Sequence, residues 1–279
     1  MKKLLSMLFL TLFTIFVVYP VIFIVLGTIM GGTEVKEYLS PLFNKSTSFA
    51  TWSLLPTRPT LRFYVEIIFD TPGFFIMFWN SMKSVVFLCL GQTIISISAA
   101  WVLAIYDFKG KNFIICGYIF LSIVPFVVLM LPQYIILKEF QLLNTLSAIV
   151  IPQIFSTLPI IIMYAFFKKI PKELLDGARL DGASEIYIFF KIGIPLGKVG
   201  IHLAMLFSFI EQWGLFEQPL LFIEKKSLWT LPIFLTNIDL NFISLAFVSS
   251  MLSMIPPMLI MRSSIGELKK GIAEISIGE

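Results

Sequence analysis

Residue types that build catalytic and metal sites are scarce in this sequence. Its 279 residues include one histidine and two cysteines, and only 14% of the residues are charged. A lone His202 supplies neither a cluster of transition-metal ligands nor a Ser/His/Asp triad, so we expect it to pack or to lie at an interface. Cys89 and Cys116 lie inside apolar runs, where a small side chain usually packs. The composition predicts a protein that is not an enzyme and that binds no metal.

A phosphate-binding loop is also missing from the sequence. The pattern G-x-x-x-x-G-K-[ST] places a glycine five residues before its second glycine, and in front of Gly110-Lys111 that place is held by Ile105. We therefore expect that the chain does not bind ATP itself.

Long apolar runs make up most of the remaining sequence. Hydrophobic residues account for 58% of the chain, and its longest runs approach the roughly 20 residues with which an α-helix crosses about 30 Å of hydrocarbon. The first run lacks a small-residue cleavage pattern, which favours an uncleaved membrane helix over a signal peptide. The predicted fold class is all-α and integral to the membrane. Six transmembrane helices are expected, at residues 4–30, 81–106, 113–131, 146–167, 200–223 and 242–261.

Basic residues predict the orientation of these helices. Most of the 21 Lys and Arg residues fall on the face that carries the amino terminus, and the cytoplasmic loops of membrane proteins are enriched in Lys and Arg. Both termini are therefore predicted to be cytoplasmic, and the net charge of +4 reflects this topology rather than nucleic-acid binding. The predicted organisation is an N-terminal helix (1–30), an extracytoplasmic segment (31–80), a transmembrane core (81–262) containing a cytoplasmic loop (171–195), and a cytoplasmic tail (263–279).

The loop at residues 171–195 is charged and contains glycine, although long apolar runs flank it. Pro171 suits the first turn of a helix, and Arg179 stands near the end of that helix. Gly182 then permits a turn with positive φ, and Ser184 can cap a second short helix. Two apolar faces are expected, one on each helix, formed by Leu174, Leu175 and Ala178 and by Ile186, Phe189 and Phe190.

The residues of this loop leave two roles open. Two short amphipathic helices at a sharp turn could insert into a cleft on another protein, or they could rest on lipid head groups. Physical chemistry alone favours neither role.

The loop resembles the segment that defines the permeases of ABC importers, in which Glu-Ala-Ala, three residues, Gly and about nine more residues lead to Ile-x-Leu-Pro. The matching positions in this chain are Asp176, Gly177, Ala178, Gly182, Ile192, Ile194 and Pro195. Asp replaces Glu, Gly replaces the first Ala and Ile replaces Leu. The glycine at 177 should weaken the first helix by about 1 kcal/mol.

The resemblance extends over nearly the whole chain. More narrowly, the chain is similar to the second permease subunit of carbohydrate-uptake importers, the maltose-type permeases. Further matches lie at residues 79–81 (Trp-Asn-Ser), 108–111, 143–145, 179–184, 213, 219–220 and 230–232. This likeness implies the type I importer permease fold and a bacterial-type plasma membrane. It also implies partners: a second six-helix permease, two cytoplasmic ATPases that carry the ATP and Mg, and an extracytoplasmic solute-binding protein.

The resemblance also implies roles for the loop residues. In such permeases the loop docks in a cleft of the ATPase dimer, and closure around ATP switches the helices between inward-open and outward-open states. We therefore expect the contact with the ATPase at Asp176, Gly177, Ala178, Asp181 and Gly182. Ile192 and Pro195 would complete the motif.

Polar residues interrupt the fifth apolar run. A carboxylate near the middle of the bilayer is costly unless it faces protein or water, so this run is the candidate substrate path. The residues concerned are Glu211, Gln212, Trp213, Glu217 and Gln218. Trp213 could stack on a sugar ring, but these residues could instead pair with the second permease or gate the cavity.

Three classes of function remain to be compared. A secondary transporter often shows paired repeats in its two halves, which this sequence lacks, and a channel would need no docking loop. The predicted function is therefore an ABC importer permease for a carbohydrate. The alternative substrates are glycerol phosphate and sugar-acid derivatives.

Overall fold

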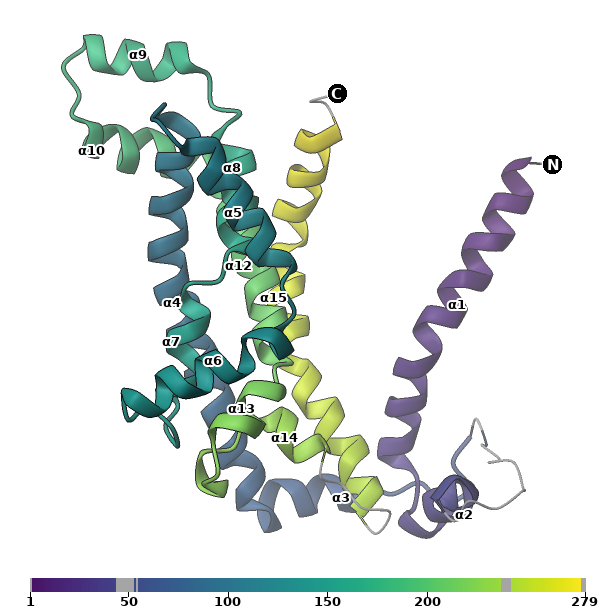
Figure 1. Cartoon of the computed structure of the whole chain (residues 1–279). Helices are drawn as coiled ribbons and strands as arrows, with labels where there is room; N and C mark the ends of the chain where they lie inside the picture. Colours follow the sequence, from purple (N-terminus) through teal and green to yellow (C-terminus); the bar gives the residue numbers. More distant parts are fainter. Residues whose placement is uncertain (1, 44–52, 54, 237–241, 277–279) are drawn as a thin grey trace. The chain divides into compact units, whose positions relative to one another are not determined.

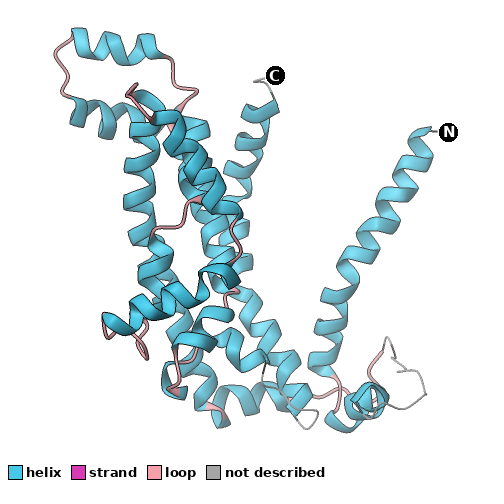
Figure 2. Ribbon diagram, in the orientation of Figure 1, coloured by secondary structure: helices cyan, strands magenta, loops and turns pink. Residues whose placement is uncertain are grey.

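The computed structural model describes residues 2–43, 53, 55–236 and 242–276 of the chain. Within these ranges the secondary structure is entirely helical, with loops between the helices (Figures 1 and 2). This confirms the predicted all-α class. Parts of the predicted segment 31–80 and of the tail 263–279 lie outside the described residues.

The helices group into two compact units, one formed by residues 1–78 and 233–255 and the other by residues 79–232 and 256–279. The first unit contains α1 (Lys2–Ile29), α2 (Gly32–Phe43), α3 (Arg62–Val65) and a π-helical turn (Glu66–Asp70). It also takes in most of α14 (Leu231–Thr236) and the first parts of α4 (Pro72–Ile105) and α15 (Ile243–Ser276).

A small core holds the first unit together. Met30, Val35 and Leu39 are buried against Phe247. The buried carboxylate of Glu34 accepts hydrogen bonds from the backbone N–H groups of Thr57, at 2.9 Å, and Arg58, at 3.3 Å. These bonds satisfy a charge that would be costly to bury without partners, and they fix the segment around residue 57 against the start of α2.

The second unit holds the remaining helices. They are α5 (Lys111–Ile123), α6 (Phe126–Glu139), α7 (Ser147–Ile154), α8 (Leu158–Phe167), α9 (Lys172–Leu180), α10 (Glu185–Ile188), α11 (Ile194–Leu196), α12 (Lys198–Trp213) and α13 (Glu217–Phe222). A π-helical turn at Phe189–Gly193 joins α10 to α11, and a single 3₁₀ turn at Lys226–Leu228 follows α13.

Glycines allow α12 to pack tightly on α8. A Cβ atom at Gly200 would lie 2.5 Å from the ring of Phe166, and one at Gly197 would overlap the ring of Phe167. The two backbones can approach this closely only because neither glycine carries a side chain, which is a common device between membrane helices. The core beside this seam contains Trp101, Phe167, Leu175 and Ile188.

Four helices among the described residues are long and apolar enough to cross a membrane, and there are up to six spans if each of two bent pairs is one span. The four are Lys3–Ile29, Pro72–Ile105, Ser147–Phe167 and Ile243–Lys269. Large apolar side chains along α1 are exposed to the surroundings, as expected for a helix in lipid. The prediction of a multi-pass membrane protein is thereby supported.

Several helix boundaries differ from the predicted ones. The second span was expected at residues 81–106, but α4 begins at Pro72 and is 34 residues long. The span expected at 113–131 is divided between α5 and α6, which meet at 99°. Pro125 explains this break, because a proline disfavours helical geometry in the residue before it and Val124 is extended.

The span expected at 200–223 also differs. Helix α12 ends at Trp213, Gly214 caps it, and α13 is a separate short helix. The segment before α12, Glu185–Leu196, is bent against it by 70°.

Candidate functional site

The turn between α9 and α10 has the backbone geometry that its sequence predicted. Gly182 adopts φ +83°, in the left-handed region that favours glycine. Its N–H donates to the carbonyl of Arg179, and the N–H of Ala183 donates to the carbonyl of Ala178, both at 3.0 Å. These two bonds form a Schellman motif, which satisfies carbonyl groups at the end of α9.

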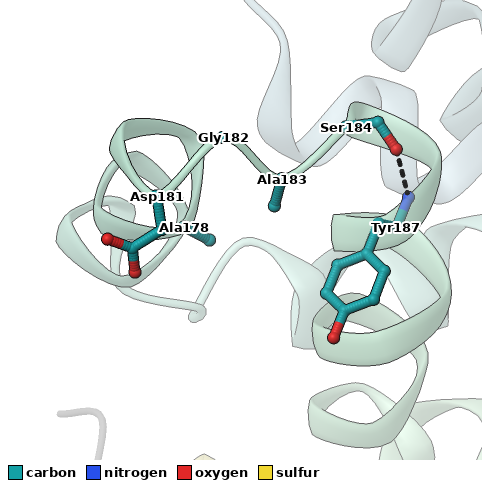
Figure 3. Close-up of a pocket in the computed structure, with 6 residues that line it drawn as sticks. All are labelled: Ala178, Asp181, Gly182, Ala183, Ser184 and Tyr187. Atoms are coloured by element: carbon teal, nitrogen blue, oxygen red, sulfur yellow. Dashed lines mark hydrogen bonds between the residues drawn. The ribbon is translucent and has the colours of Figure 1, made fainter.

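The start of α10 confirms the predicted cap. The Ser184 hydroxyl accepts a hydrogen bond from the backbone N–H of Tyr187 at 3.3 Å (Figure 3). The turn and the two helix ends line an open hollow on the surface, formed by Ala178, Asp181, Gly182, Ala183, Ser184 and Tyr187. Figure 3 shows the Asp181 carboxylate at the end of α9, away from α10.

The residues that the sequence predicts to contact an ATPase, on α9 and in the turn, are largely accessible. Asp176, Gly177 and Asp181 are exposed, and Ala178 is half-buried. Leu180 is 90% exposed, although it is a large apolar residue at the end of a short helix. The end of α9 therefore presents both apolar and acidic surface.

The two predicted apolar faces are only partly correct. Leu175 is 1% exposed and Ala178 packs beside it, but Leu174 faces outward. In the second helix Ile188 is fully buried, while the expected Ile186 and Phe190 are exposed. The reason is that α10 contains only four residues and continues as a π-helical turn, so the regular helical spacing fails there.

Ile192 and Pro195 lie away from the turn. Ile192 is half-buried against the core that contains Trp101 and Phe167, whereas Pro195 is exposed in α11. These two residues therefore belong to the base of the loop, and only the residues from 176 to 182 form its tip.

An ion-pair network, which the sequence did not predict, joins the two helices of the loop. The guanidinium of Arg179 donates to Asp176 at 2.7 Å and to both carboxylate oxygens of Glu185, at 2.7 and 3.2 Å. Glu185 also accepts a hydrogen bond at 2.6 Å from the hydroxyl of Tyr106, just after α4. The hydrogen bonds from Arg179, followed by that from Tyr106, hold the pKa of Glu185 below its ordinary value.

A second pair of contacts lies at the other end of α9. The carboxylate of Asp107 accepts from Lys111 at 3.1 Å and from Lys172, the first residue of α9, at 3.3 Å. The hydrogen bonds from these two lysines lower the pKa of Asp107. The spacing of Asp107 and Lys111 by four residues was a possible sequence signal for part of this cluster, but nothing in the sequence indicates Lys172 as a partner.

Comparison with known proteins identifies the family. Residues 92–265, more than half of the chain, match the family model described as "Binding-protein-dependent transport system inner membrane component". The chain belongs to this family. It is therefore a permease of ABC importers, as the loop motif predicted.

Relatives and a solved structure agree with this assignment. The permease is 28% identical over 222 residues to the arabinooligosaccharides transport system permease protein AraQ of Halalkalibacterium halodurans, covering 79% of this chain and 76% of AraQ. It is 30% identical over 217 residues to the sulfoquinovosyl glycerol transport system permease protein SmoH of Agrobacterium fabrum, covering 77% and 72%.

The fold itself matches a chain in the crystal structure of a bacterial ABC transporter involved in the import of the acidic polysaccharide alginate. The TM-score is 0.78 at 20% identity, and the match covers 95% of each chain. The predicted type I importer permease fold is confirmed.

The residues that the sequence nominated for the substrate path of this permease do not share one surface. Glu211 and Glu217 are exposed. Trp213 is only 7% exposed and stacks on Phe209 at 5.7 Å between ring centroids, and Gln218 is 1% exposed. Stacking of the Trp213 ring on a sugar would therefore require this packing to open.

Two neighbouring polar residues have local structural partners. The buried Gln212 donates to the side chain of Gln153 at 3.3 Å, which links α12 to α7. His202 is exposed, and its Nδ1 lies 2.7 Å from the carbonyl oxygen of Lys198 in the previous helical turn. Neither contact marks a site for a ligand.

Proposed function

We propose that this permease pairs with a second, different permease to form the alternating-access path of a carbohydrate importer. AraQ and SmoH are named as permeases for arabinooligosaccharides and for sulfoquinovosyl glycerol. Both solutes contain sugars, which supports a carbohydrate substrate. A solute-binding protein would deliver the sugar at the extracytoplasmic face. Both termini and the α9–α10 loop would then face the cytoplasm.

The observation that carries the proposal is the turn at Gly182. Its Schellman geometry presents Asp176, Asp181 and the exposed Leu180 at the tip of a compact loop, in a chain whose family works with partner proteins. A cleft on an ATPase can bind such a tip through apolar contact and through the acidic side chains. We propose that two ATPase subunits hold the ATP and Mg and hydrolyse the ATP, while this chain binds no cofactor.

The exposed carboxylates Glu211 and Glu217 are the proposed polar part of the path on this subunit. Each can accept hydrogen bonds from sugar hydroxyl groups, or from polar groups of the second permease, without any rearrangement of the core. Trp213 and Gln218 would contribute by holding α12 and α13 in place, because both are buried.

The test is purification of the tagged permease in mild detergent together with its co-encoded proteins. We expect an ATPase that contains a phosphate-binding loop and one different permease to accompany it. The complex is then placed in proteoliposomes with the binding protein, and ATP-dependent uptake of radiolabelled arabinotriose, glucuronate and glycerol 3-phosphate is compared. Uptake of a sugar supports the proposal.

Other outcomes would replace the proposal. A homo-oligomer without ATPase, with uptake driven by an ion gradient, would indicate a secondary transporter. ATP-driven uptake of glycerol 3-phosphate alone would retain the importer and overturn the carbohydrate assignment.

A further inference from the structure

Both ends of α9 are attached to the two residues that directly follow α4. At the amino end, Lys172 donates to Asp107 at 3.3 Å. At the carboxyl end, Arg179 holds Glu185, and Tyr106 donates to the same carboxylate at 2.6 Å. Tyr106 and Asp107 are neighbours in the chain. Both ends of α9 are therefore attached to the same short segment after α4.

Apolar packing lies beneath these polar contacts. The ring of Trp101, near the end of α4, lies 5.4 Å from that of Phe167 and 5.6 Å from that of Phe189. Leu175 of α9 and Ile188 of α10 are buried in the same cluster. The loop therefore rests on the last turns of α4 in addition to being linked to the residues after them.

These polar contacts are suited to fixing the orientation of α9 rather than to stabilising the fold. Exposed ion pairs contribute little to the stability of a fold, and the carboxylates concerned are about half exposed or more. The guanidinium of Arg179, however, binds both oxygens of Glu185, and such a two-point contact sets the orientation of the two groups. Because α9 is attached at both ends, its rotation relative to α4 is further limited.

We propose that Arg179, Glu185, Tyr106 and the Asp107–Lys172 pair are positioning residues for transport, which make α9 and the carboxyl end of α4 move as one body. This rests on the proposed function, in which an ATPase displaces α9. The displacement then reaches α4 through these contacts. Without the contacts, α9 can move with the ATPase while α4 stays behind.

The test measures a distance within the complete transporter, in nanodiscs with its second permease and ATPases. Nitroxide labels are placed on cysteines at Glu173→Cys, an exposed position of α9 outside the 176–182 tip, and Lys109→Cys, with Cys89 and Cys116 replaced by alanine. In the otherwise unchanged protein we expect a narrow distance distribution that is the same with and without ATP and vanadate. In Arg179→Gln the distribution becomes about twofold wider and shifts when ATP and vanadate are added.

Matched variants separate positioning from folding. Lys191→Gln removes an exposed charge from the same loop and should leave the distribution narrow. Tyr106→Phe and Lys172→Gln should each widen it, and Arg179→Lys should give an intermediate width because the charge remains but the two-point contact is lost. Each variant must retain the ATPase on purification, which shows that the complex is assembled.

A functional measurement accompanies the distances. With the solute that the uptake comparison identifies, Arg179→Gln should hydrolyse about fivefold more ATP for each molecule imported. The double variant Arg179→Gln/Glu185→Gln should be no worse than the more affected single variant. Unchanged widths and unchanged ATP use in all positioning variants would overturn the inference while leaving the importer intact. Failure of the starting protein to bind an ATPase would instead overturn the proposed function.

Discussion

The α9–α10 loop and the α12–α13 segment contain the two groups of residues that the sequence nominated for function. The two groups differ in how far their side chains are accessible in the structure. In the loop, the nominated tip from Asp176 to Gly182 is accessible and its backbone turn is as predicted. In α12–α13, Glu211 and Glu217 are exposed while Trp213 and Gln218 are buried. Local backbone geometry therefore followed from the sequence, whereas the direction of side chains on a packed membrane helix did not.

The largest effect is expected from Gly182→Val. At φ +83° a β-branched residue is strained, although nothing lies within 4 Å of the place its Cβ would occupy, so the cost comes from the backbone alone. We expect uptake to fall more than about tenfold at normal abundance in the membrane, because the turn that presents α9 is lost. The measurement is ATP-dependent uptake in proteoliposomes.

Gly177→Ala is the matched control for this change. Gly177 also has free space at its Cβ position but lies inside α9 without a positive φ, so alanine should stabilise the helix and preserve uptake. If Gly182→Val and Gly177→Ala transported equally well, the turn would have no role in transport.

The second expected effect concerns stability in the other region. Trp213→Ala removes a buried ring that stacks on Phe209, and we expect a loss of about 3 kcal/mol from the cavity left behind. Glu211→Gln changes an exposed group and should leave stability unaltered, while lowering uptake if the carboxylate lines the path. Thermal unfolding in detergent and uptake are measured on both variants. A Trp213→Ala protein of normal stability and altered substrate preference would place this ring in the substrate path after all.

The extent of correct prediction has a physical explanation. A positive φ at Gly182 and a cap at Ser184 depend on a few neighbouring residues, so the sequence contains the information. The pairing of Lys172 with Asp107 joins residues that are 65 positions apart. The residues next to Lys172 contain no signal for this partner, because the fold alone brings the two side chains together. The bend after Val124 was only partly predictable. Pro125 is evident in the sequence, but prolines are also tolerated inside membrane helices, so its presence alone does not predict a break.

A smaller effect is expected from Ser184→Ala. The hydroxyl accepts one hydrogen bond, from Tyr187, and its removal from a helix N-terminus costs about 1 kcal/mol. Because α10 is short and the buried Ile188 still holds it, we expect a lower melting temperature with uptake largely retained. Ser184→Asp, which can also cap, should restore the melting temperature. Loss of uptake in Ser184→Ala at an unchanged melting temperature would instead show that the hydroxyl itself contacts a partner.

The smallest effect is a pH dependence of the loop, which separates its charged contacts from its apolar packing. Hydrogen bonds from Arg179 and then Tyr106 lower the pKa of Glu185 in the folded protein below its ordinary value near 4.5. The contribution of this carboxylate is therefore fully present above that ordinary value and is lost as the pH falls through the lowered folded pKa. With nitroxides at positions 173 and 109, the distance distribution should be constant from pH 7 to pH 5 and should widen only at more acidic pH. In Glu185→Gln the distribution should already be wide at pH 7, and the part of the widening below pH 5 that depends on this carboxylate should be missing. Any widening that remains is expected from Asp107, whose pKa is also lowered by its lysine partners. A widening of equal size in both proteins would show that the acid acts through another group, such as the Asp107 carboxylate that pairs with Lys172, and not through Glu185.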